Sequence, residues 1–209
     1  AVNTAMIIVF LIGDKFISYF SNKKITNPIR LDGPKDHIIK KIGTPTMGGV
    51  LILIGVFTGV FLWSDLYNPY NWLLIFITFS FGTLGAFDDY KKIKDKNSNG
   101  ISPKLKFIIQ IVLSLISLII LYNFIDSDLT NNLYFPFFKN LVINLGWFFI
   151  PFYLFVIVGS SNAVNLTDGL DGLAIVPVMI ACVSFALISY LVCNINFSNY
   201  HQKNYVQGV

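Results

Sequence analysis

The sequence predicts an all-α, polytopic integral membrane protein, built as a bundle of six membrane-spanning helices. Hydrophobic residues make up 55% of the 209 residues and charged residues only 12%. The mean hydropathy is +0.66, which is far from that of an ordinary soluble domain. The apolar residues also gather into six stretches of about the 20 residues that a bilayer requires. The alternative, buried core helices of a large soluble protein, fits this composition much less well.

The first three expected spans lie near residues 2–19, 47–63 and 72–87. The first has no basic leader and no small-residue cleavage site, so we do not expect a cleaved signal peptide. It begins with alanine and not with methionine, which suggests a truncated start. The second and third spans are apolar stretches with Trp63 and Trp72 near their ends, where aromatic belts occur at membrane interfaces. Packing against lipid explains these tryptophans equally well.

The last three expected spans lie near residues 107–124, 145–163 and 173–192. The fourth follows a lysine-rich loop. The fifth and sixth lie on either side of a polar segment, residues 162–174. We expect all six spans to form a single membrane domain over residues 1–209.

Basic residues lie mainly in two of the loops, and this predicts the orientation. The loops after the first and third spans hold twelve of the fifteen lysines and arginines, whereas the stretches 64–71, 125–144 and 193–209 hold two. By the positive-inside rule the two basic loops are cytoplasmic, and the N-terminus lies outside. The polar segment 162–174 then also lies on the cytoplasmic side. A basic inner face also serves simply to attract anionic lipid.

Four aspartates adjoin these cytoplasmic loops and suggest chemistry. Asp88 and Asp89 follow the third span, and Asp168 and Asp171 lie in the polar segment. In the polar segment between two apolar stretches, an ionised carboxylate at mid-membrane would cost about 2.5–3.5 kcal/mol, so packing is a poor reason for Asp168 and Asp171. Carboxylates and lysines at one depth indicate a magnesium-bridged phosphate site. The structural alternatives are a solvated helix end for the first pair and a helix cap for the second.

Neighbouring residues on a helix point about 100° apart, so Asp88 and Asp89 are expected to have different roles. Asn165, Asp168 and Asp171 are spaced three apart and would share one helical face, although the nearby glycines favour a partly unwound loop almost as much.

A glycine-rich segment precedes the second span. Residues 43–49, Gly-Thr-Pro-Thr-Met-Gly-Gly, open this span after two lysines. Backbone N–H groups there suit a phosphate, and an ordinary helix start is the alternative.

Three segments together resemble the cytoplasmic motifs of the phospho-N-acetylmuramoyl-pentapeptide transferases, within the polyprenyl-phosphate N-acetylhexosamine-1-phosphate transferase superfamily. They are residues 41–49, Phe-Asp-Asp-Tyr-Lys-Lys at 87–92, and Asn-Leu-Thr-Asp-Gly-Leu-Asp-Gly at 165–172. Residues 30–34 and 136–139 look like the same family, so the resemblance covers almost the whole chain. The motif sequences at 43–49, Gly-Thr-Pro-Thr-Met-Gly-Gly, and at 165–169, Asn-Leu-Thr-Asp-Gly, favour this family over relatives that use UDP-N-acetylglucosamine.

The resemblance implies transfer of phospho-N-acetylmuramoyl-pentapeptide from UDP to undecaprenyl phosphate, giving lipid I and UMP, with Mg²⁺. It implies a bacterial inner membrane, the lipid bilayer as surroundings and no nucleic-acid partner, and it leaves open whether the protein is a homodimer. The resemblance also assigns roles to individual residues. Asp88 would deprotonate or support the lipid phosphate, with Asp89 assisting it, and Lys92, Asp168 and Asp171 would contact the nucleotide part of the substrate. Lys41 and Thr46 would line the phosphate side, and Asn165 would orient the Asp168 loop.

One departure from the family matters. Its members run to about ten spans and carry a metal-binding Asp in a Phe-x-Gly-Asp motif and a histidine-rich loop, both beyond the matched region. Neither motif is in this sequence. We therefore expect a fragment truncated at both ends and inactive by itself, whose metal ligands are unknown and whose main aspartate ligand lies in the missing C-terminal part.

Two rivals remain, one from another class of protein and one among the enzymes. A secondary transporter would also place polar residues beside a glycine-broken helix, but near the bilayer midplane. A CDP-alcohol phosphatidyltransferase would carry an arginine after Asp-Gly-x-Ala, and residues 171–174 have none.

Overall fold

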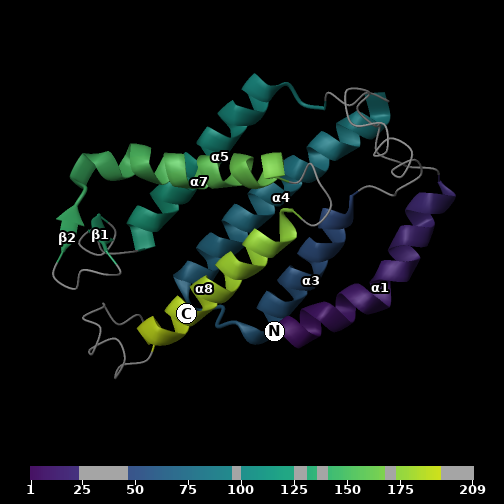
Figure 1. Ribbon diagram of the computed structural model, residues 1–209, viewed down its shortest axis with the longest axis horizontal. Coiled ribbons are helices and arrows are strands. Elements are labelled where there is room, and N and C mark those ends of the chain that lie inside the picture. The colour runs from purple at the N-terminus through teal and green to yellow at the C-terminus, as the bar shows by residue number, and fades with distance from the viewer. Residues whose placement is uncertain (24–46, 96–99, 125–130, 136–140, 168–172, 194–209) are drawn as a thin grey trace. The chain divides into compact units, whose positions relative to one another are not determined.

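The computed structural model describes residues 1–23, 47–95, 100–124, 131–135, 141–167 and 173–193. These residues form six α-helices, a short 3₁₀-helix and two short strands (Figure 1). The α-helices are α1 (Val2–Asn22), α3 (Gly48–Trp63), α4 (Pro69–Asp95), α5 (Pro103–Phe124), α7 (Phe149–Thr167) and α8 (Ile175–Cys193). One helix overlaps each of the six expected spans.

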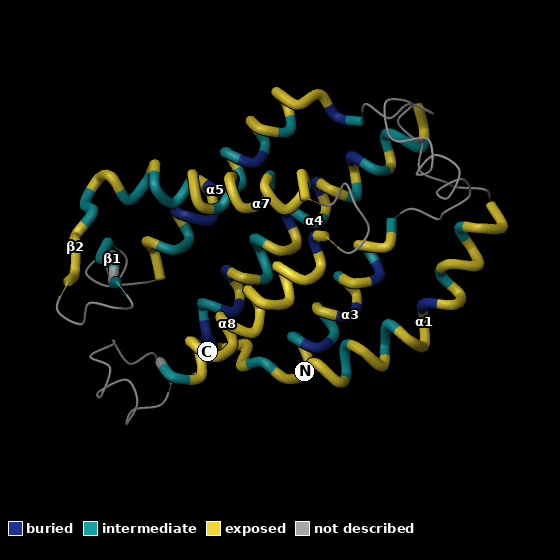
Figure 2. Tube along the Cα trace, viewed as in Figure 1, coloured by how far each residue is buried: buried dark blue, intermediate teal, exposed yellow. Residues whose placement is uncertain are grey.

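The helices have the length and composition of membrane spans. The segments Val2–Asn22, Pro69–Asp95, Pro103–Phe124 and Gly146–Thr167 are long and apolar enough to cross a bilayer, and the apolar helices Gly48–Trp63 and Ile175–Leu191 are shorter. Along α1 and α8 most residues are exposed (Figure 2), including large apolar ones such as Phe10 and Phe185. Such surfaces are stable in lipid and unfavourable in water. The predicted all-α, multi-pass membrane class is confirmed.

A small antiparallel ribbon is the one described element that the sequence analysis did not predict. Strand β1 (Asn132–Tyr134) pairs with β2 (Val142–Asn144), and the 3₁₀-helix η1 (Gly146–Phe148) leads directly into α7. Each strand has three residues, too few to show the alternating pattern that identifies a strand in a sequence.

The chain divides into two compact units, and each is described by itself. The first contains Ala1–Leu66 and Leu74–Gln110. In it α1 packs against α3 (Figure 1) at positions where α3 has glycines. A Cβ atom on Gly55 would lie 2.7 Å from Val9 Cγ2 and 3.1 Å from the Ala5 carbonyl oxygen. Small residues let two backbones approach in a membrane, where van der Waals contact drives helix association.

Aromatic and apolar side chains connect α3 to α4 in the same unit. The rings of Phe57 and Phe79 are edge-to-face, with centroids 6.1 Å apart. The Leu53 side chain packs directly on Gly82, and a Cβ atom on Gly82 would clash with it. These contacts fix the part of α4 that leads to the acidic pair.

The second unit contains Tyr67–Leu73 and Ile111–Val209. Ser114 and Ser117 of α5 are fully buried, and the Ser117 hydroxyl lies 2.9 Å from the Tyr153 hydroxyl of α7. Tyr122 adds an edge-to-face contact with Phe149, at 6.1 Å between centroids. Hydrogen bonding between the helices satisfies polar groups that would otherwise be costly in an apolar environment.

Candidate active site

The acidic pair lies inside α4, about two turns before the helix ends at Asp95. The sequence predicts that the span ends near residue 87, with Asp88 and Asp89 at its end, whereas the helix continues through them. Two features of the sequence explain the extension. Asp88 and Lys92 are an i,i+4 pair, which stabilises a helix, and Lys92 and Lys94 in the last turn interact favourably with the helix dipole.

Asp88 is buried, with 7% of the residue exposed, and its carboxylate is held from three segments. The backbone N–H of Ile101 donates to Oδ1 at 2.7 Å. The Lys92 ammonium group lies 2.7 Å from Oδ2, and that of Lys106, in the first turns of α5, lies 3.8 Å from the same oxygen. A carboxylate offers about four acceptor positions, and the described contacts with Ile101 and Lys92 use two of them. Lys106, at 3.8 Å, is beyond hydrogen-bond distance and contributes through its charge.

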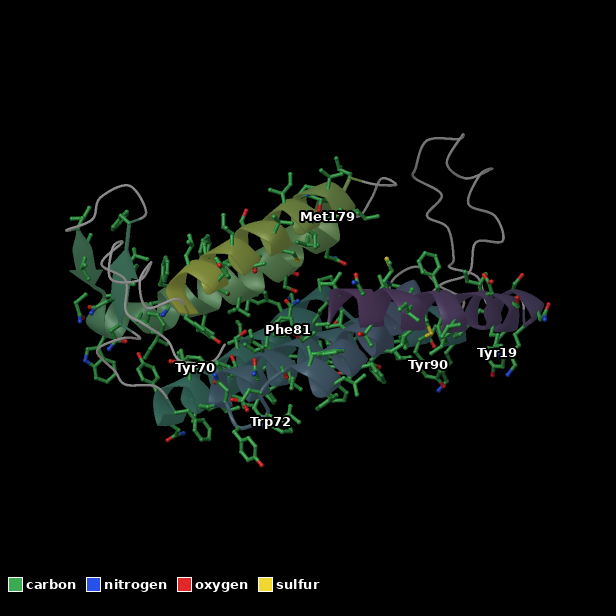
Figure 3. The ribbon with its side chains drawn as sticks, turned by 90° about the horizontal axis from the view of Figure 1, so that it is seen from below. Tyr19, Tyr70, Trp72, Phe81, Tyr90 and Met179 are labelled. Carbon is green, nitrogen blue, oxygen red and sulfur yellow. The ribbon has the colours of Figure 1, made fainter. Side chains whose placement is uncertain are left out.

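Asp89 has different surroundings from its neighbour. Its side chain keeps 35% of its surface exposed, and Oδ1 lies 3.3 Å from the Lys92 Nζ atom. Lys92 therefore bridges both carboxylates. Tyr90, the next residue, is 54% exposed, and its ring projects from α4 (Figure 3). Asp88 is thus the more tightly held of the two carboxylates, and Asp89 is the more exposed.

The cluster of Asp88, Asp89, Lys92 and Lys106 has two negative and two positive groups within a few ångströms. Fixed ammonium groups in a partly buried place attract phosphate oxygens more strongly than solvated ones do. Carboxylate oxygens are the ligands that Mg²⁺ prefers, and it usually binds one or two of them together with substrate phosphates. The donor set of the pair therefore fits Mg²⁺. Within the described ranges no three His, Cys, Asp or Glu side chains gather in a metal-binding group.

The remaining predicted site residues are only partly described. Asn165 lies in the last turn of α7 and is exposed; it belongs to the second unit. Lys41, Thr46, Asp168 and Asp171 lie outside the described residues. The structure therefore brings together three of the predicted residues, Asp88, Asp89 and Lys92.

Three further residues of the cluster were not predicted as site residues. Lys106 was counted only as a basic loop residue, and Gly100 and Ile101 carried no assignment. Their link to Asp88 is tertiary, across 12 to 18 positions, and no periodic pattern reports such a contact. Gly100 was the available signal, because a glycine in a polar segment shortly before a helix, here three residues before Pro103, often marks a special backbone conformation, and its φ is +59°.

The fold and the cluster together define a class: multi-pass membrane proteins with paired carboxylates and lysines at the end of a membrane-spanning helix. The chain belongs to glycosyl transferase family 4, which residues 71–202 match. Residues 41–53 match signature 1 of the phospho-N-acetylmuramoyl-pentapeptide transferases.

Several similar proteins are phospho-N-acetylmuramoyl-pentapeptide transferases by name. A phospho-N-acetylmuramoyl-pentapeptide transferase of Pelagibacter ubique is 60% identical over 206 residues, 99% of this chain and 57% of the relative. Those of Bartonella quintana and Rhodopseudomonas palustris are 48% and 47% identical, and the alignments cover this whole chain and 57% and 58% of the relatives. The chain thus spans less than two thirds of the relatives' length. The resemblance drawn from the motifs is confirmed.

Proposed function

We propose that the protein transfers phospho-N-acetylmuramoyl-pentapeptide from UDP to undecaprenyl phosphate, giving lipid I and UMP. The match of residues 41–53 to the transferase signature, beside relatives of that name, is the observation that carries the proposal. The alternative of a UDP-N-acetylglucosamine transferase has no comparable support. We further propose the bacterial inner membrane, with the N-terminus outside and the site facing the cytoplasm.

In the proposed reaction an oxygen of the lipid phosphate forms a bond to the β-phosphorus of the nucleotide substrate. The bond from that phosphorus to the bridging oxygen breaks, and UMP leaves with the electron pair. The anions repel each other, so catalysis consists mainly of holding them in line and neutralising their charge. Mg²⁺, when bound, would supply positive charge at the phosphates, and the exposed oxygens of Asp89 are the described donors best suited to it.

The chain's own residues take the other roles. As the resemblance assigns, Asp88 accepts the proton of the lipid phosphate or supports that group, with the acceptor positions that Ile101 and Lys92 leave open. Lys92 lies between the two carboxylates and would bind the nucleotide part, as the resemblance also assigns to Asp168 and Asp171. On the same basis, Lys41 and Thr46 would contact phosphate, and Asn165 would orient the loop that follows α7.

The test is exchange of radiolabelled UDP-N-acetylmuramoyl-pentapeptide with UMP, in membranes that hold the complete gene product and undecaprenyl phosphate. We expect exchange with the wild type and at least a tenfold loss with Lys92→Ala, since a positioned ammonium group stabilises developing charge. Lys94→Ala is the matched control: it removes an exposed lysine from the last turn of the same helix and should leave exchange unchanged. Absence of exchange in the wild type, or equal rates for both variants, would count against the proposal.

A further inference from the structure

The turn before α5 approaches Asp88 so closely that it has no space for a side chain. Gly100 has φ +59°, a left-handed conformation that L residues other than glycine rarely adopt. A Cβ atom at this position would clash with Asp88 Oδ1 and would lie 2.9 Å from Lys92 Cε. Both the backbone conformation and the lack of space therefore require glycine here.

The next residue uses this close approach. Ile101 is buried, with 5% exposed, and its backbone N–H donates to Asp88 Oδ1 at 2.7 Å. A hydrogen bond from an N–H group to a carboxylate is roughly twice as strong as a neutral one. The buried isoleucine side chain fixes the N–H in place, so the bond orients Oδ1 while Lys92 and Lys106 face Oδ2.

A second described glycine offers an internal comparison. Gly146, at the start of η1, also has a positive φ, +48°. A Cβ atom on Gly146 would have as its nearest contact Asn144 Oδ1 at 3.8 Å, which is ordinary van der Waals distance. Replacing Gly146 by alanine therefore introduces backbone strain without a steric clash. Comparing it with Gly100→Ala separates the effect of backbone strain from the effect of the clash with Asp88.

We propose that Gly100 and Ile101 form a positioning clamp for Asp88: the Ile101 amide fixes the carboxylate, and the missing side chain of Gly100 lets the amide reach it. Its effect on turnover rests on the proposed function, whereas its effect on the structure does not. The clamp acts through Asp88 and touches no substrate. An error of about 1 Å in the position of a reacting group can lower a rate by about a hundredfold.

The structural part is tested by hydrogen–deuterium exchange, with fragmentation that resolves the Ile101 amide. We expect Asp88→Ala to speed its exchange at least tenfold and Asp88→Asn, which keeps a weaker acceptor of the same shape, to give an intermediate rate. Asp89→Ala is the matched control and should leave the rate within twofold. Equal protection of this amide in the wild type and in Asp88→Ala would overturn the clamp, whatever the protein catalyses.

The kinetic part compares the two glycines in the complete gene product. We expect Gly100→Ala to lower kcat by about ten- to a hundredfold, with KM for the nucleotide substrate within twofold. Gly146→Ala should leave both within twofold, and Ile101→Val, which keeps the amide, should retain kcat. If the two alanine variants lose kcat equally, the clamp is wrong. If the wild type shows no transfer while Ile101 protection depends on Asp88, the proposed function fails and the clamp stands.

Discussion

Replacing Lys92 should destabilise the protein measurably, because this side chain bridges two carboxylates. Its ammonium group lies 2.7 Å from Asp88 Oδ2 and 3.3 Å from Asp89 Oδ1. Removing one partner of a fully buried ion pair costs about 3–5 kcal/mol. Here 23% of the lysine side chain and 10% of the Asp88 side chain are exposed, which lowers the expected cost. A hydrogen bond to a charged group contributes about 1.5–3 kcal/mol.

The contact with Asp89 adds little. That side chain is 35% exposed, and pairs of this kind contribute about 0–1 kcal/mol. Lys106, at 3.8 Å from Asp88 Oδ2, remains in Lys92→Ala and compensates for part of the lost charge. We therefore expect Lys92→Ala to lower the free energy of unfolding by about 2 kcal/mol.

A double-mutant cycle measures the pair itself. The variants are Asp88→Ala, Lys92→Ala and the two together, and the assay is equilibrium unfolding in mixed micelles with increasing sodium dodecyl sulfate. We expect a coupling energy of about 1.5–3 kcal/mol and a double variant less destabilised than the sum of the singles. A cycle of Lys94→Ala with Asp88→Ala is the control and should give about zero. A coupling of Asp88 with Lys92 below about 0.5 kcal/mol would refute the reasoning, because two sites without a shared interaction add to within that amount.

Three further predictions concern orientation, helix packing and the metal. In a background without cysteines, Tyr90→Cys should react with a membrane-impermeant maleimide from the cytoplasmic side, and Tyr67→Cys, 98% exposed in the stretch 64–71, from the outside; the reverse pattern would invert the topology. Gly55→Leu should destabilise the protein by about 1–3 kcal/mol in the same unfolding assay, because its Cβ position is already 2.7 Å from Val9 Cγ2. Gly159→Leu, with nothing within 4 Å, is the control, and equal losses would refute the α1–α3 packing. Removing divalent cations with EDTA should abolish exchange of UMP with the nucleotide substrate, and added Mg²⁺ should restore it; exchange that survives EDTA would argue against the metal.

Hydrophobicity predicted the helices well because a bilayer leaves the chain few alternatives. Backbone groups in lipid must be satisfied within the segment, so a long apolar stretch is a helix. The ends of the helices were harder to predict. The span near 72–87 was placed by its apolar residues, but α4 continues to Asp95 because of polar contacts such as Asp88 with Lys92. Apolar periodicity carries no information about how far a helix continues beyond its apolar stretch.

The acidic pair was identified from the sequence because two adjacent carboxylates end an apolar span at the depth of the lysine-rich loops. Their unequal surroundings were also expected, since neighbours on a helix point in different directions. The residues that contact Asp88 from other segments were not predicted. Ile101 donates through its backbone, which every residue except proline has, so its side chain says nothing of the bond. Lys106 is one of many lysines that the topology rule explains equally well.

The charge balance of the cluster limits what it can do alone. Two carboxylates face two ammonium groups, so the described cluster has no net charge with which to hold a pyrophosphate and a second phosphate together. The proposed reaction brings several negative charges to one place, and like charges at contact repel strongly in a poorly solvated site. Further cations are needed, and Mg²⁺ on the accessible Asp89 together with Lys41, from the segment that matches the transferase signature, would supply them. On this reasoning, the ion pairs of Asp88 hold the end of α4 and the start of α5 in place, and Lys92 acts on the phosphates together with these further cations.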